Sequence, residues 1–160
     1  MIIRILTKIF GKKYKKSYSQ CGEDLLIKYI FTLRNIHTPT YIDIGANDPF
    51  FLSNTALFYS KGSKGVNIEA NPNLHKNFET KRSRDINLNI GINDKDDELD
   101  FYIMEDNTLS TFSKDESDFM QTQGKILKEV KKIKLTTVTS IIDKHCGGVF
   151  PDFLSIDVEG

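Results

Sequence analysis

The stretch 40–49 constrains this chain most, because it predicts a buried strand that runs directly into a tight turn carrying acids. Tyr41–Ile44 is largely apolar and β-favouring, and the breaker cluster Asn47-Asp48-Pro49 follows it. Gly45 lies between them and permits a sharp turn that lets the backbone approach a ligand closely. The pattern is typical of a ligand site at the carboxyl end of a strand in an α/β protein.

A second strand with an acid at its end follows. Gly65–Ile68 is predicted to be this strand, and Glu69 comes directly after it. In doubly wound proteins an acid about 20 residues beyond the glycine turn binds the ribose hydroxyls of a nucleotide. Glu69 is therefore our candidate ribose ligand.

The glycine turn argues against a dinucleotide. A dinucleotide fingerprint needs three glycines, so that the pyrophosphate can approach backbone N–H groups at a helix N-terminus. Here Asn47 and Phe50 follow Gly45 instead, and Asp43 and Glu69 would repel phosphate groups. The same acids suit a ligand that carries hydroxyls and positive charge, such as S-adenosylmethionine. A nicotinamide-dependent oxidoreductase is the less favoured alternative.

Composition fits one globular domain. The chain has 160 residues, 39% of them hydrophobic, and its 22 basic residues balance 22 acidic ones. No net charge therefore attracts nucleic acid, and we expect no nucleic-acid partner. Cys21 and Cys146 match no metal-binding spacing, so we expect reduced thiols and a cytoplasmic location.

The first sixteen residues differ from the rest, since they contain six cations and no acid. Their apolar residues fall at helical spacing, but the run is too short for a membrane span. We interpret residues 1–16 as a basic amphipathic leader with two alternative roles: weak peripheral contact with an anionic membrane, or packing on its own domain. The domain itself is expected over residues 17–160.

Helices are predicted between the strands. Before the first strand, Leu25–Leu33 has the spacing of an amphipathic helix, with Ser19 as its N-cap and with Glu23 and Asp24 in its first turn. Beyond the glycine turn we predict two β-α-β units with parallel strands. Their helices and the third strand are expected at 56–59, 74–81 and 86–90.

The middle of the chain is less regular. Asn93–Glu98 is an acidic turn that we interpret as solvated rather than metal-binding, and Leu99–Ile103 after it is predicted to form a hairpin with the third strand. Residues 107–124 are polar, and Leu109–Ser113 within them fits either a substrate-facing segment or a connector. Lys131–Thr136 alternates as an edge strand does, and a short helix is predicted over Thr137–Lys144.

The end of the chain repeats the pattern of the stretch 40–49. Asp152–Ile156 is predicted to be a fourth strand, and Asp157 follows it. If this strand lies on the other side of the first one, Asp157 and Gly45 flank the crevice in which doubly wound folds bind ligands.

Five ordered motifs in residues 17–160 resemble the FkbM-type family of S-adenosylmethionine-dependent methyltransferases. They are Ser19-Gln20 with Gly22-Glu23-Asp24, Asp43-Ile44-Gly45-Ala46-Asn47, Ser53-Asn54-Thr55, Ile68-Glu69-Ala70-Asn71-Pro72 and Ile156-Asp157-Val158-Glu159-Gly160. The resemblance implies a Rossmann-like α/β fold with a mostly parallel sheet and helices on both faces. It also implies methyl transfer to oxygen, with sugars and small metabolites as typical acceptors. Such domains continue through a further helix and strands, so the resemblance implies a truncation after the fourth strand.

The resemblance also suggests which residues form the site. We expect the cofactor to contact Gln20, Asp43, Gly45, Asn47, Ser53, Asn54, Glu69 and Ile92, and we expect no metal. Methyl transfer is an in-line displacement that needs alignment and a base for the hydroxyl proton. Asp157 is the candidate base and Glu159 the second choice, with anchoring of the following turn as the alternative for both.

Two further alternatives stay open. Ser53 and Asn54 fit plain helix capping as well as they fit cofactor contact. For the chain as a whole, the alternative to an enzyme that methylates a small molecule or glycan is a catalytically silent interaction module of the same fold.

Overall fold

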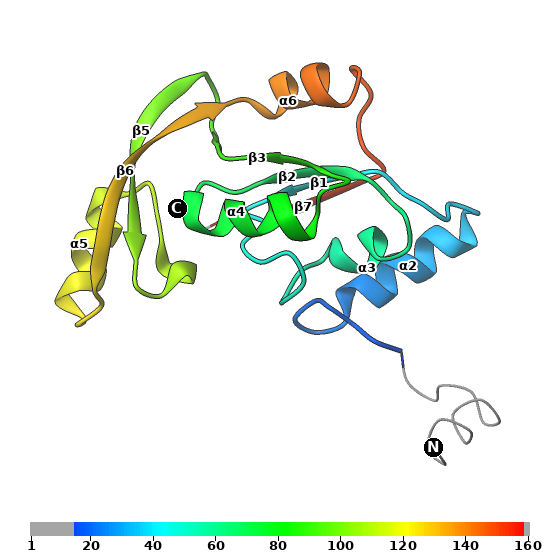
Figure 1. Cartoon of the computed structure of the whole chain (residues 1–160), viewed down its shortest axis with the longest axis horizontal. Coiled ribbons are helices and arrows are strands. Elements are labelled where there is room, and N and C mark those ends of the chain that lie inside the picture. The colour runs from blue at the N-terminus through cyan, green and yellow to red at the C-terminus, as the bar shows by residue number, and fades with distance from the viewer. Residues whose placement is uncertain (1–14, 159–160) are drawn as a thin grey trace, which may run out of the picture.

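The first sheet contains four parallel strands. The computed structural model describes residues 15–158 and orders these strands β3-β2-β1-β7. Their bounds are Tyr41–Ile44 for β1, Gly65–Ile68 for β2, Ile86–Leu88 for β3 and Phe153–Ile156 for β7. All three pairings are parallel (Figure 1). The predicted β-α-β units, and the predicted place of the fourth strand beside the first, are confirmed.

Helices cover both faces of this sheet, as expected for a Rossmann-like fold. Figure 1 shows α2, α3 and α4 on one face and α6 on the other. Their bounds are Glu23–Leu33, Ala56–Tyr59, Pro72–Lys81 and Val138–His145, respectively. The predicted cap of α2 is wrong, because Gly22, with a left-handed φ of 91°, is the N-cap. The Ser19 hydroxyl instead accepts from the N–H groups of Gly22 and Asp24.

Side chains of β1 alternate between two cores. Ile42 and Ile44 pack with Ile141 of α6 on one face, whereas Tyr41 packs with Phe58 of α3 on the other. Burial of an apolar side chain of this size contributes about 1.5–3 kcal/mol. The strand is therefore buried on both faces, which is why its sequence is apolar apart from Asp43.

The chain between β3 and α6 forms a second, three-stranded sheet, and the predicted hairpin with the third strand is wrong. Its order is β4-β6-β5, with bounds of Gly91–Ile92, Leu127–Thr136 and Asp97–Met104, respectively. β5 pairs antiparallel with β6, and β6 is the middle strand rather than an edge. Alternation reports the two faces of a strand but not which strand lies beside it, so the pattern alone did not identify the partner.

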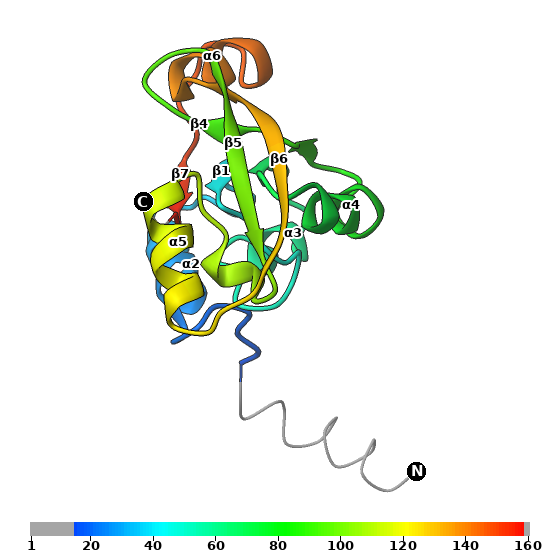
Figure 2. The same ribbon diagram turned by 90° about the vertical axis from the view of Figure 1, so that its left-hand side faces the viewer.

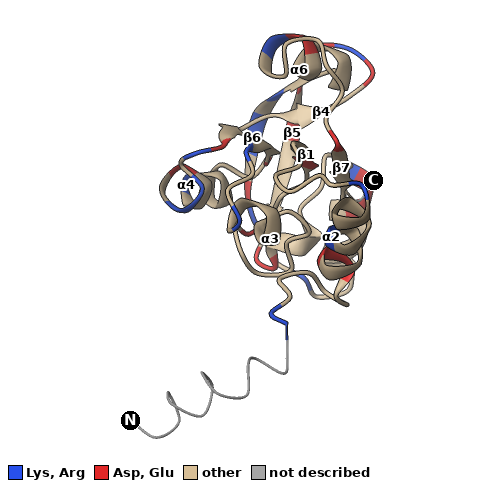
Figure 3. Ribbon diagram, turned by 90° about the vertical axis from the view of Figure 1, so that its right-hand side faces the viewer, with Lys and Arg blue, Asp and Glu red and all other residues tan. Residues whose placement is uncertain are grey.

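Opposite charges face one another along β5 and β6. Asp100 is the register partner of Lys132, and Glu98 that of Lys134; Lys132 Nζ lies 3.3 Å from Asp100 Oδ1. Figure 3 shows the basic residues on the β6 ribbon. Exposed pairs of this kind contribute about 0–1 kcal/mol each, so they select the register of the two strands more than they stabilise the fold.

A further helix, α5, lies in the polar stretch 107–124, where none was predicted. It spans Lys114–Thr122 and follows a short 3-10 helix, η1, at Asn107–Leu109. Ser113 caps α5 by accepting from the Glu116 N–H. The spacing of Ser113 and Glu116 is that of a capping box, which was the signal in the sequence for this helix.

The predicted leader lies outside the described residues, apart from Lys15 and Lys16. Within residues 15–158, no helix is both long enough and apolar enough to cross a bilayer. Cys21 and Cys146 are free thiols, as the sequence predicted.

A buried charged network joins the first sheet to α3 and α4. Arg82, at the end of α4, is 0% exposed, and its Nε lies 2.9 Å from Asp85 Oδ2. Its other nitrogens donate to the Tyr41 hydroxyl at 2.7 Å, the Thr55 hydroxyl at 3.1 Å and the Pro49 carbonyl at 3.2 Å. One buried cation thus fixes β1, the loop after it and the end of α4 relative to one another.

Replacement of this cation tests its role. Arg82→Met should lower the free energy of unfolding by about 3–5 kcal/mol, because it leaves the Asp85 carboxylate buried without its cation. Urea denaturation measures the change. Lys81→Met removes a neighbouring exposed cation and serves as the control, with an expected change below about 0.5 kcal/mol. Equal effects of the two substitutions would contradict the assigned role of Arg82.

Candidate functional site

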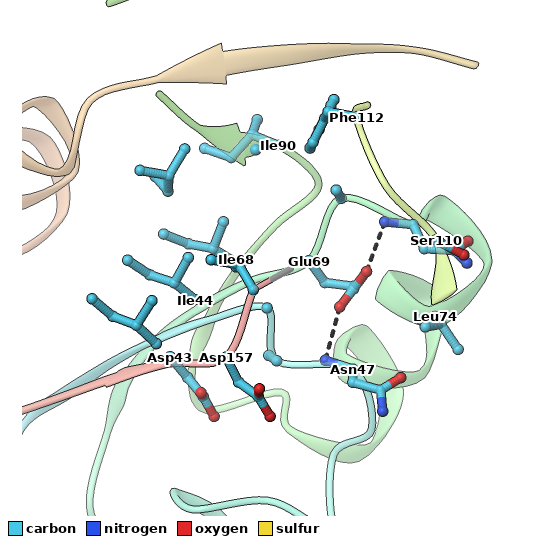
Figure 4. A pocket seen from close by; sticks show the side chains of 18 of the residues that line it. Asp43, Ile44, Asn47, Ile68, Glu69, Leu74, Ile90, Ser110, Phe112 and Asp157 are labelled. Atoms are coloured by element: carbon cyan, nitrogen blue, oxygen red, sulfur yellow. Dashed lines mark hydrogen bonds between the residues drawn. The ribbon is translucent and has the colours of Figure 1, made fainter. Parts of the chain in front are cut away.

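A cavity of about 820 Å³ opens where the carboxyl ends of β1, β2 and β7 face the second sheet. Figure 2 shows β5 and β6 standing across this edge of the first sheet, and Figure 4 shows the cavity from close by. Its volume is that of a small-molecule site. The predicted site residues of the described chain all line it: Gln20, Asp43, Gly45, Asn47, Ser53, Asn54, Glu69, Ile92 and Asp157. Glu159 lies outside the described residues.

Gly45 is required because the ends of β1 and β7 meet there. Its φ is +75°, and a Cβ at this position would collide with the Asp157 carbonyl oxygen and lie 3.1 Å from Val158 Cγ1. The N–H groups of Gly45 and Ala46 both donate to the Ile68 carbonyl, at 3.0 and 3.1 Å. The close approach that demands a glycine is therefore that of the β7 backbone, whereas the sequence had suggested the approach of a ligand.

Glu69 holds the turn that follows β1. Its Oε2 accepts from the Asn47 N–H at 2.8 Å and its Oε1 from the Asn71 N–H at 2.7 Å (Figure 4). Burial raises the pKa of Glu69, and the two N–H groups oppose this shift. Because a carboxylate has about four acceptor sites, Glu69 can accept from the hydroxyls of a ligand while it fixes the turn.

Asp43 and Asp157 place further acids on one side of the cavity (Figure 4). Asp43 is buried and accepts from the Thr55 hydroxyl at 2.6 Å. Burial raises the pKa of Asp43, Thr55 and Arg82 lower it, and the nearby charge of Asp157 raises it again. Asp157 is exposed, and no side chain of residues 15–158 donates a hydrogen bond to its carboxylate, so this carboxylate is free to meet a ligand.

Ser53 and Asn54 both make hydrogen bonds within the protein, so each has a structural role. Ser53 Oγ accepts from the Ala56 N–H at 3.2 Å, in the first turn of α3, whereas Thr55 is the N-cap residue of this helix. Asn54 Nδ2 donates to Ser155 Oγ at 3.4 Å and so contacts β7. Both residues also line the cavity, and their contact with a cofactor stays a prediction.

The opposite wall of the cavity contains residues of the segment 109–113, for which a substrate-facing role was one of two predicted alternatives, and Phe101, which sequence reasoning missed. Phe101 and Phe112, whose ring centroids lie 4.6 Å apart, line it from the second sheet and from the segment that follows η1. The Asn71 side chain donates to Asn107 Oδ1 at 3.1 Å and ties this wall to the loop after β2. The segment 109–113 contains one aromatic residue, Phe112, which was the sequence signal for this wall.

The polarity of the cavity changes across it. Figure 4 shows Asp43 and Asp157 on one side, Ile90 and Phe112 on another, and Glu69 between them. A complementary ligand carries positive charge at one end, hydroxyls in the middle and a flat apolar group at the other end. Within residues 15–158, no group of three or more His, Cys, Asp or Glu side chains is arranged to hold a metal ion.

The family of the chain follows from a comparison with known proteins. A family model described as the methyltransferase FkbM domain matches residues 43–160. No curated protein and no solved structure matches the chain. The matched region begins within β1 and contains the rest of both sheets, the Gly45 turn and the acids of the cavity. The chain therefore belongs to the FkbM methyltransferase family and has its Rossmann-like methyltransferase fold.

Proposed function

We propose that this methyltransferase binds S-adenosylmethionine in the cavity and transfers its methyl group to a hydroxyl oxygen of a small molecule or glycan. The observation that supports this most is the order of polarity: acids, then Glu69, then the apolar wall of Ile90 and Phe112. S-adenosylmethionine has the same order, with its ammonium and sulfonium groups, its ribose and its adenine. The free thiols are consistent with the cytoplasm as its location.

Each part of the cavity has a task in this proposal. Glu69 accepts from the ribose hydroxyls with the lone pairs that the N–H groups of Asn47 and Asn71 leave unused. Ile90 and Phe112 bury the adenine, and the negative charge at Asp43 and Asp157 stabilises the cationic end. A nicotinamide dinucleotide fits less well, since these same acids would face its pyrophosphate.

Methyl transfer requires little covalent chemistry from the protein. The bound cofactor supplies a methyl group activated by its sulfonium, and the chain aligns the acceptor oxygen with it. Asp157 lies at the carboxyl end of β7 with its carboxylate free of side-chain donors within the described residues. It is therefore the proposed base that takes the hydroxyl proton.

Glu69→Gln tests the ribose contact. Affinity for S-adenosylmethionine should fall by about 1–3 kcal/mol, because an amide group replaces one acceptor oxygen of a buried carboxylate. Thermal stability should fall too, since the amide cannot accept from both the Asn47 and Asn71 N–H groups. Isothermal calorimetry with the exposed Glu79→Gln variant as control measures the first effect.

A cofactor analogue separates the ribose contact from the role of Glu69 in the turn. If Glu69 binds the ribose, removal of the 2′-hydroxyl and the Glu69→Gln substitution act on one interaction, so their losses of affinity should not add. Fully additive losses, or an unchanged affinity of the variant, would exclude Glu69 from the ribose site. Tighter binding of NAD than of S-adenosylmethionine would reject the proposed cofactor.

Asp157→Asn tests the base. Turnover should fall by about 10²–10⁴-fold, because an amide keeps the shape but does not accept the proton. Affinity for S-adenosylhomocysteine, which has no sulfonium charge for Asp157 to stabilise, should stay within about twofold, a free-energy change below about 0.5 kcal/mol. Release of S-adenosylhomocysteine with a panel of glycans and small hydroxyl compounds measures turnover. Asp152→Asn, at the other end of β7, is the control, and equal losses in both variants would argue for a structural role.

A further inference from the structure

The loop between β1 and α3 contains a leucine in a conformation that leucine rarely adopts. Leu52 has a φ of +53°, in the left-handed region, where a bulky side chain is unfavourable. Asn47 of the same loop has a φ of +52°, which asparagine tolerates. Strained residues persist where the surroundings hold them, and they cluster at functional sites.

Two hydrogen bonds fix the backbone on either side of Leu52. Before it, the Arg82 guanidinium donates to the Pro49 carbonyl at 3.2 Å. After it, the Ser53 N–H donates to the Tyr18 carbonyl at 2.9 Å. The strained conformation is therefore imposed by contacts of the fold and not by the solvent-exposed leucine itself.

The segment that carries Tyr18 is fixed in turn by a buried acid. Asp24 is 0% exposed and accepts from the Tyr18 N–H at 2.8 Å and from the Ser17 hydroxyl at 2.7 Å. The Tyr18 ring packs against Phe50, with 5.9 Å between centroids. Phe50, which belongs to the same loop as Leu52, is thus packed against the domain.

Two apolar side chains of the loop between β1 and α3 are not buried in the domain. Phe51 and Leu52 are 68% and 44% exposed, and Leu52 lines the cavity that contains Asp157. Neither side chain belongs to an apolar cluster of the described chain. Because asparagine or glycine would adopt this φ with less strain, folding does not account for a leucine here.

We propose that Leu52, with Phe51 beside it, selects the acceptor and binds an apolar segment attached to the hydroxyl that is methylated. This inference rests on the proposed function, in which Ile90 and Phe112 contact the apolar part of the cofactor. Leu52 is then an apolar contact for the acceptor in the same cavity as Asp157. The acceptor class is a hydroxyl compound with an alkyl or similar apolar substituent, rather than a fully polar sugar.

Alkyl glycosides provide the probe. Octyl β-D-glucopyranoside, below its micelle-forming concentration, and methyl β-D-glucopyranoside are titrated into the full chain with and without S-adenosylhomocysteine, and binding is followed by NMR. The unsubstituted chain should bind the octyl compound at least fivefold more tightly than the methyl compound. Leu52→Asn should abolish this preference. Leu26→Gln, which removes a leucine of α2 that is more exposed than Leu52, should retain it.

The melting temperature supplies a second test. If Leu52 stabilised the fold, its replacement would lower the melting temperature, whereas a leucine kept for acceptor binding predicts no decrease. Leu52→Asn and Leu52→Gly should keep the melting temperature or raise it by about 2–4 °C, because both residues relieve the strain. A lowered melting temperature in both variants, an octyl preference that survives Leu52→Asn, or no preference in the unsubstituted chain would each overturn the inference. Failure of the proposed function is distinct: it appears as absent binding of S-adenosylhomocysteine.

Discussion

The buried pair of Arg82 and Asp85 is the interaction on which the site depends. Asp85 accepts from the Tyr41 hydroxyl at 2.6 Å, and Arg82 donates to the Thr55 hydroxyl, which itself donates to Asp43. Hydrogen bonds thus run without a break from the amino end of β1 to an acid of the cavity. A buried ion pair contributes little net stability relative to apolar residues. Its effect here is positional, because it links the two ends of a short strand to one helix end.

The acids of the cavity combine structural and ligand-facing roles. Glu69 accepts from the N–H groups of Asn47 and Asn71, and these groups belong to the turns that form the cavity floor. Burial of Glu69 raises its pKa, whereas the N–H groups favour its charged form. A ligand that donates to Glu69 therefore meets an acceptor whose orientation is already fixed, so little conformational entropy is lost on binding.

The parallel sheet could be predicted from the sequence because its determinants are local. β1 and β2 have the predicted bounds, and the place of β7 followed from the repeated pattern of strand, acid and glycine. The second sheet could not be predicted from the sequence, because the pairing of its strands depends on contacts between residues far apart in the chain. Arg82 was missed for a related reason: a cation at a helix end resembles a surface residue until its partners Tyr41 and Thr55 are known. Gly45 was found, but the backbone that it accommodates belongs to a strand more than 100 residues away.

The two walls of the cavity belong to different apolar clusters. The first sheet packs through the clusters of Ile42 and Tyr41, and the second through that of Phe101, Ile103 and Ile133. Substitutions in the second cluster can reshape one wall while the network of buried hydrogen bonds behind the other stays intact. During divergence, a chain of this architecture can therefore change the wall that contains Phe101 and Phe112 by drift in the second sheet, while the acids at the carboxyl ends of the parallel strands keep their positions.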